Sequence, residues 1–319
     1  MKNRSIVVVL MLALVFTLVS CGDDAGEGEK TLYSLDSVQD YLNGASGGKT
    51  AVSPLRLKLI LDLGNMSAGS GWHELLSHID LAEKYVELNL SACTITGAVW
   101  FNPDSSTSSG KNRIVSMVLP DDNAITIPAG TDTLATFAHF TVLRSIKGGA
   151  YTGSIGAYAF SGCTSLVGVN FPANEANLGD YAFRNCSSLA SVKLPKSKII
   201  GSGAFRGCTG LRTVNIPLVE QIGSNAFYNT GTAALTINLG ADAPTLDIKI
   251  FETVTAKTVT VKVPSGAIGY TPFSGTNVTV SSGSGDTWAN GLRGAGWNGT
   301  NVADSTAINQ GITVKIEKK

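Results

Sequence analysis

Residues 155–172 decide the fold, and they read Ile-Gly-Ala-Tyr-Ala-Phe-Ser-Gly-Cys-Thr-Ser-Leu-Val-Gly-Val-Asn-Phe-Pro. The same phrase returns at residues 178–195 and 200–217. The phrase repeats every 22 to 23 residues, which is far longer than the period of a helix or a strand. Self-similarity at this length indicates one supersecondary unit that stacks on copies of itself. The sequence therefore predicts a solenoid.

Each unit combines a short strand with a turn. The ending Leu-x-x-Val-x-apolar-Pro has the apolar alternation of a strand, with proline at its exit. The preceding Ala-Phe-x-x-Cys predicts a short helical or 3₁₀ turn that folds back over the strand. A lone unit could not bury its Phe, whose burial stabilises by roughly 1.5–3 kcal/mol. The aligned columns are Phe160, Phe183, Phe205 and Phe227, then Cys163, Cys186, Cys208 and Thr230, then Leu166, Leu189 and Leu211, then Val169, Val192 and Val214.

The repeat extends beyond its three regular copies. Related strand patterns occur at residues 85–90, 114–120 and 143–146. Farther along, the same register is kept by Ile237 and Leu239 and then by Val261, Val263 and Pro264, which gives about eight coils. Phe137 and Phe140 fall in the Phe and Cys columns, and residues 102–112 form an irregular insertion.

The phrase Ile-Gly-x-x-Ala-Phe-x-x-Cys-x-x-Leu-x-x-Val-x-x-Pro resembles the BspA-like, or treponemal, type of leucine-rich repeat, strictly over residues 155–217 and loosely over 85–264. This resemblance implies an α/β solenoid, a right-handed coil with one short parallel β-strand per repeat. It also implies a surface protein of anaerobic or spirochaete-like bacteria that acts in adhesion or other surface interactions. The spacing by itself predicts only the solenoid.

The N-terminus has the features of an export signal. Lys2 and Arg4 precede an apolar run over residues 6–19, which is shorter than the roughly 20 residues of a membrane-spanning helix. The run ends in Leu-Val-Ser-Cys21, which resembles a bacterial lipobox, so we expect Cys21 to become the lipid-modified first residue. An ordinary signal peptide with a coincidental cysteine is the alternative. Several acyl chains would give stable anchoring to the cell envelope, at the outer membrane or cell surface.

These patterns divide the chain into five expected segments. We expect a signal peptide at 1–20, a flexible tether at 21–31, an α/β N-terminal cap at 32–84, the solenoid at 85–264 and a β-rich C-terminal cap at 265–319. The N-terminal cap is predicted to hold two short amphipathic helices and a strand at 57–61 between them. The C-terminal cap is predicted to hold strands at 277–280 and 311–317.

Charge and composition limit the classes of binding partner that can be expected. Without Lys2 and Arg4 the chain has 22 basic and 24 acidic residues, a net charge of −2, and no basic face, so nucleic acid is excluded as an expected partner. Charged residues make up 15%, against about 25% in typical soluble domains. Such a composition suits a neutral extracellular β-solenoid.

Three motifs could suggest chemistry but are better explained by structure. His73 and His78 lie five apart, not four as in the zinc-protease helix, which favours a solvated helix face over a metal site. Gly294 to Gly299 matches a dinucleotide motif only in letters, since no βαβ unit fits around it. The cysteine column is interpreted as core packing, with one disulfide within it or thiol chemistry as alternatives. Cys93 has no partner in this scheme.

No catalytic set, cofactor site or metal site can be assembled, so we predict a protein that is not an enzyme. Trp288 and Trp297 are interpreted as part of the C-terminal cap, with stacking on sugar rings as the alternative.

Binding is expected on the face of the sheet. In each strand the third and fifth repeat positions point outward, which yields a small, polar and mildly cationic strip. The predicted ligand-binding residues are Glu87, Asn89, Ser116, Ser145, Lys147, Asn170, Ser191, Lys193, Thr213, Asn215, Thr236, Asn238, Thr260 and Lys262.

These features together predict a non-catalytic cell-surface lipoprotein that binds an extracellular protein or glycan of a host or another microbe, and is held to the membrane by the lipid on Cys21. One alternative is a structural envelope lipoprotein that faces the periplasm. Another is a protein that acts on glycans through its Trp-bearing end.

Overall fold

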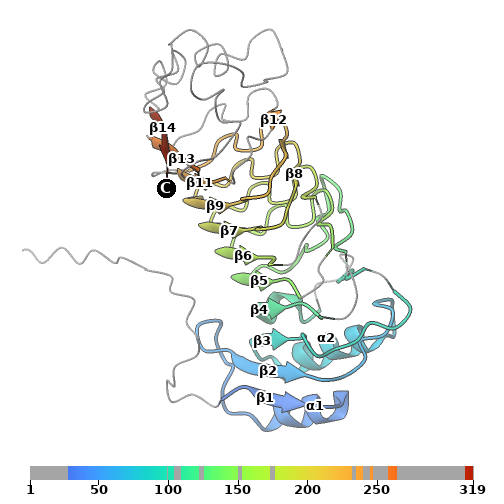
Figure 1. Cartoon of the computed structure of the whole chain (residues 1–319). Coiled ribbons are helices and arrows are strands. Elements are labelled where there is room, and N and C mark those ends of the chain that lie inside the picture. Colours follow the sequence, from blue (N-terminus) through green and yellow to red (C-terminus); the bar gives the residue numbers. More distant parts are fainter. Residues whose placement is uncertain are drawn as a thin grey trace, which may run out of the picture.

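The computed structural model describes residues 28–98, 100–103, 109–121, 126–149, 153–172, 177–231, 235–239, 245–246, 258–263 and 313–318. Its main element is one parallel sheet in which the strands follow the chain order, one strand for each coil (Figure 1). The strands are β1 Lys30–Leu32, β2 Leu55–Leu59, β3 Val86–Asn89, β4 Ile114–Val118, β5 Ser145–Lys147, β6 Gly168–Asn170, β7 Ser191–Lys193, β9 Thr213–Asn215, β11 Leu235–Asn238, β13 Thr258–Val263 and β14 Thr313–Lys318. The predicted parallel-strand solenoid is confirmed.

In the coils from Ile127 onward a second, narrower ladder joins the opposite side of the solenoid. It consists of β8 Ile199–Ile200, β10 Gln221–Ile222 and β12 Thr245–Leu246, which pair in parallel. Single bridges extend this ladder from Ile200 back through Leu178 and Ile155 to Ile127. These are the apolar residues that open the repeat phrase, so the backbone of each unit is bonded to its neighbours at two places.

The N-terminal segment continues the same sheet. Helix α1 Leu35–Gly44 follows β1, and helix α2 Gly71–Ala82 lies between β2 and β3. Figure 1 shows both helices at the end of the solenoid that carries β1. The strand expected at 57–61 lies instead at Leu55–Leu59, because Leu55, Leu57 and Leu59 alternate inward. The domain boundaries themselves stay a prediction.

The turn half of each unit is not a helix. Cys163 N–H donates to the Phe160 carbonyl three residues back, whereas Phe160 N–H donates to Ala182 of the next coil. Tyr158 has a φ of 55°, in the left-handed region, which interrupts any helical run. The segment is therefore a chain of tight turns, with alternate N–H groups bonded within the coil and between coils. A 3₁₀ helix, η1 Lys111–Arg113, is described at the entry to β4.

The second residue of the repeat phrase is glycine because the coils touch there. A Cβ added to Gly179 would lie 2.4 Å from the backbone nitrogen of Ala157, and one added to Gly201 would lie 2.6 Å from that of Asp180. Real Cβ atoms do not approach other atoms so closely. The glycine column therefore sets how tightly successive coils pack.

A stack of aromatic rings runs through the core. The rings of Phe160 and Phe183 have centroids 5.0 Å apart and are 3° from parallel, and the other steps from Phe137 to Phe227 are similar. Phe101 extends the stack at 6.2 Å from Phe137 and meets the indole of Trp72 in helix α2 edge-on at 5.2 Å. The N-terminal helix and the repeats therefore share one core.

Candidate binding surface

The predicted surface is formed by two rows of residues that cross the sheet in strict register. The first row contains the third repeat positions and the second row contains the fifth. From β3 to β13 the first row is Glu87, Ser116, Ser145, Gly168, Ser191, Thr213, Thr236 and Thr260. The second row is Asn89, Val118, Lys147, Asn170, Lys193, Asn215, Asn238 and Lys262.

In the strands from β3 to β11 the row residues are half-buried or exposed, while the residues between them are buried. In β6, for example, Val169 is buried between the half-buried Gly168 and Asn170, and the same alternation occurs in β5, β7 and β9. All fourteen predicted residues therefore lie at the expected register positions. Their role in binding a ligand stays a prediction.

At the N-terminal end of the rows the polar groups already have partners inside the protein. Arg56 Nε lies 3.5 Å from Glu87 Oε2, and Asn89 donates to Glu29 Oε1 at 3.0 Å. Asn89 Oδ1 also accepts hydrogen bonds from Ser91. Farther along, the hydroxyls of Ser116 and Ser145 lie 2.7 Å apart.

Sequence reasoning missed two extensions of this surface. Arg56 and Lys58 of β2 continue the first and second rows, because β2 pairs with β3 in the same register. The signal was the alternation Leu55-Arg-Leu57-Lys-Leu59, which the expected strand at 57–61 cut in two. Arg144 and Arg212 are also exposed, each just before a strand of the face.

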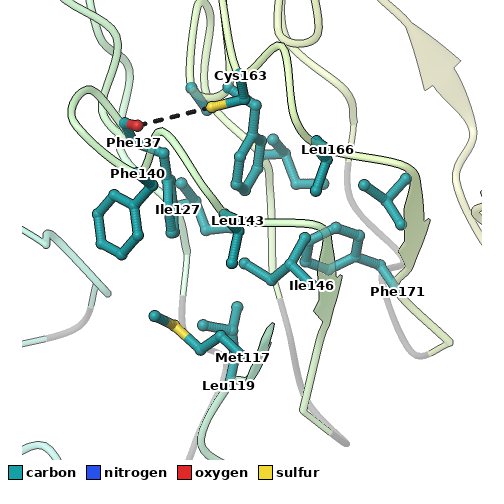
Figure 2. Close-up of a cluster of buried hydrophobic side chains, with 14 of the residues drawn as sticks. Met117, Leu119, Ile127, Phe137, Phe140, Leu143, Ile146, Cys163, Leu166 and Phe171 are labelled. Atoms are coloured by element: carbon teal, nitrogen blue, oxygen red, sulfur yellow. Dashed lines mark hydrogen bonds between the residues drawn. The ribbon is translucent and has the colours of Figure 1, made fainter. Parts of the chain in front are cut away.

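The cysteines are core residues. All four described cysteines are free thiols and buried. The thiol of Cys163 donates to the Phe137 carbonyl of the preceding coil, as Figure 2 shows. Burial raises the pKa of the Cys163 and Cys186 thiols well above the ordinary value and that of Cys93 to about 11, so these groups are poor nucleophiles. The structure holds no disulfide among the described cysteines.

One expectation about the histidines is wrong. His78 lies on the buried face of α2, not on a solvated one, because it is three residues from the buried Leu75. Its Nε2 lies 3.9 Å from Glu74 Oε1. Among the described residues, no group of three His, Cys, Asp or Glu side chains could hold a metal ion.

Several expectations fall outside the described residues. These are the signal and the lipobox Cys21, the strand at 277–280, the glycine-rich Gly294 to Gly299, and Trp288 and Trp297. In the part of the chain that the structure covers, no helix has the length and apolar character needed to cross a membrane.

Comparison with known proteins supports the repeat type. Residues 131–257 match the family described as "BspA type Leucine rich repeat region", in six copies. A solved structure of a leucine-rich repeat protein from Bacteroides ovatus is 18% identical, with a TM-score of 0.19. That match covers 59% of this chain and 64% of that structure, which is less than two thirds of its length. No curated protein matches the chain.

Proposed function

The chain carries a BspA-type leucine-rich-repeat region, a class of repeat that generally binds proteins and is generally non-catalytic, and from this premise we propose that it is a binding protein of the cell surface. The ligand is a protein or glycan on a host or on another microbe. The supporting observation is the pair of rows that cross the sheet from β3 to β13 in unbroken register.

The shape of this surface suits a large ligand. Its residues are small and polar, so the face of the sheet offers many hydrogen-bonding groups at a spacing of about 4.8 Å from strand to strand. Extended faces of stacked repeats are the usual binding surfaces of solenoids. Without large aromatic anchors, each contact contributes little, and affinity comes from many contacts and many displayed copies.

The proposed anchor is a lipid on Cys21. Its support is the sequence alone, an apolar signal run that ends in Leu-Val-Ser-Cys. Several acyl chains on one cysteine would hold the protein on the envelope and display many copies together. A Cys21→Ser variant should lose incorporation of labelled fatty acid and appear in the soluble fraction.

The binding surface is tested on arrays of matrix proteins, glycans and bacterial envelopes, against an unrelated solenoid. Ser191→Trp places a bulky ring in the middle of the first row and should abolish binding. Thr164→Trp places the same ring on an exposed turn of a neighbouring coil and should leave binding intact. Equal melting temperatures would show that both variants fold. Binding no stronger than that of the unrelated solenoid would refute the proposal.

Surface display is tested separately by protease treatment of intact cells. A protein on the cell surface is cleaved before lysis. Cleavage that requires lysis would instead favour the structural envelope lipoprotein that faces the periplasm.

A further inference from the structure

Four exposed cations surround the middle of the sheet face. Arg144 precedes strand β5 and Lys147 ends it, while Lys193 ends β7 and Arg212 precedes β9. All four side chains are exposed. The backbone N–H of Arg144 donates to Val115 and that of Arg212 to Ala190, so both arginines lie at the edge of the ladder where the strands begin. We call these four residues the cationic frame.

The surface between the four cations, called the floor of the frame, carries short and uncharged side chains. Strand β6 lies between β5 and β7 and presents Gly168 and Asn170, with Ser145 and Ser191 as the neighbours of Gly168 in the first row. From β5 to β9 there are three strand steps of about 4.8 Å, so the frame spans roughly 14 Å along the solenoid. Hydroxyl and amide groups line this floor, and Gly168 leaves its centre without a side chain.

The strands that carry the frame hold no acidic residue, and the described carboxylate beside it is Asp121, whose Oδ1 lies next to Gly149, two residues after Lys147. No Asp or Glu occurs in the strands from β4 through β11. Within the part of the chain that the structure describes, none of the four cations forms an ion pair, in contrast to Arg56 with Glu87 in the same sheet. Lys147 and Lys193 are two strand steps, about 9.6 Å, apart, which exceeds the Debye length of about 8 Å at physiological salt, so salt largely screens their mutual repulsion. An anionic ligand in direct contact with these cations would lie well inside that distance.

We propose that the cationic frame binds an acidic polysaccharide, one that carries carboxylate or sulfate groups. The polysaccharide would lie across strands β5 to β9. This inference rests on the proposed function and names the ligand class of the same surface. The four cations would contact the acidic groups, while Ser145, Asn170 and Ser191 would bond sugar hydroxyls.

The geometry favours a polysaccharide over other polyanions. An extended peptide binds sheets through free main-chain groups at an edge, but these strands are paired on both sides and offer none on the face. Single-stranded nucleic acid needs aromatic side chains for base stacking, and strands β5 to β9 carry none. A floor of hydroxyls and amides matches a polysaccharide, whose own groups are mostly hydroxyls.

The test uses dextran sulfate and neutral dextran of the same length, immobilised, with polyglutamate and single-stranded DNA as further probes. The purified protein should bind dextran sulfate, with affinity that falls steeply as salt rises, and should not bind neutral dextran. Replacing all four cations of the frame by Gln should weaken binding by about tenfold or more. The double variant Lys147→Gln/Lys193→Gln alone should weaken binding severalfold. Its control is Lys49→Gln/Lys198→Gln, which removes two exposed cations that lie outside the sheet face. The control should leave binding within about twofold of wild type.

The outcomes separate this inference from the proposed function. Binding to array ligands that survives loss of the frame overturns the inference and leaves the proposed function intact. Dextran sulfate binding that is equal in both double variants also overturns it, because the charge would then act from elsewhere. Equal or tighter binding of polyglutamate or DNA through the frame overturns the assignment to a polysaccharide. Absence of binding to every probe and every array ligand refutes both.

Discussion

The thiol of Cys186 donates a hydrogen bond to the carbonyl oxygen of Phe160 in the preceding coil, at 3.0 Å. The same bond joins Cys208 to Phe183 at 2.9 Å. The cysteine column therefore links each coil to the one before it. In the last copy Thr230 takes this position, and its hydroxyl donates instead to Phe227 of its own coil. In these regular copies a small side chain with one donor fills the position, whereas the irregular coil before them has the buried Phe140 there.

Cys186→Ala should lower the free energy of unfolding by about 1–2 kcal/mol, because it removes the donor and leaves a small void. Cys186→Thr should lose less, since its hydroxyl can reach the Phe183 carbonyl as Thr230 reaches that of Phe227. Urea unfolding followed by circular dichroism measures both variants. If the alanine variant matched wild type, the bond between the coils would have no part in stability.

The buried thiols should make stability depend on pH in the alkaline range. Burial raises the pKa of Cys93 from 9.0 to about 11, so between these values the folded protein keeps a proton that the unfolded chain releases. The stabilisation is complete below pH 9 and is lost as pH rises to 11, by roughly 2–3 kcal/mol for this residue.

Urea unfolding of wild type and Cys93→Ala at pH 7, 9 and 11 tests this dependence. The variant is expected to be less stable at pH 7 but to lose less stability between pH 9 and 11. An equal loss in both proteins would show that Cys93 does not titrate as its burial implies.

The regular columns could be predicted because each repeat meets the same environment. Phe160, Phe183 and Phe205 are buried in one stack, as their alignment implied, and even Phe137 joins it from an irregular coil. The alternation of Leu and Val likewise fixed which residues face outward. Periodicity succeeds where one local pattern has one structural outcome.

The failures occur where contacts cross between unlike segments. Phe101 joins the ring stack although no repeat pattern surrounds it, because its place depends on Trp72 and on Phe137, which are distant in sequence. The cationic frame was only partly visible for a similar reason. Lys147 and Lys193 occupy outward-facing positions of the strand alternation, whereas Arg144 and Arg212 precede their strands, where that alternation does not apply.

Gly179→Ala should destabilise the solenoid by about 1–3 kcal/mol. The added methyl would lie 2.4 Å from Ala157 N, so adjacent coils must separate. Gly168→Ala is the matched control in the same part of the solenoid, since its methyl would lie 3.3 Å from the Ser191 hydroxyl and 4.0 Å from the nearest backbone atom, the Ser191 carbonyl oxygen. The control should change stability by less than about 0.5 kcal/mol. Thermal unfolding measures both, and equal effects would show that close packing of the coils does not explain the glycine column.

Phe101→Ala should uncouple helix α2 from the repeats. The ring is fully buried between Trp72 and Phe137, and its removal is expected to cost about 3–5 kcal/mol. Because stacked repeats contact only their neighbours, the loss should be local. Hydrogen exchange should quicken in α2 and in β3 and β4, while residues 178–231 keep their protection. Trp100→Ala, next in sequence but 49% exposed, is the control and should leave exchange unchanged. Uniformly faster exchange in Phe101→Ala would mean that the whole solenoid opens as one cooperative unit, contrary to this prediction.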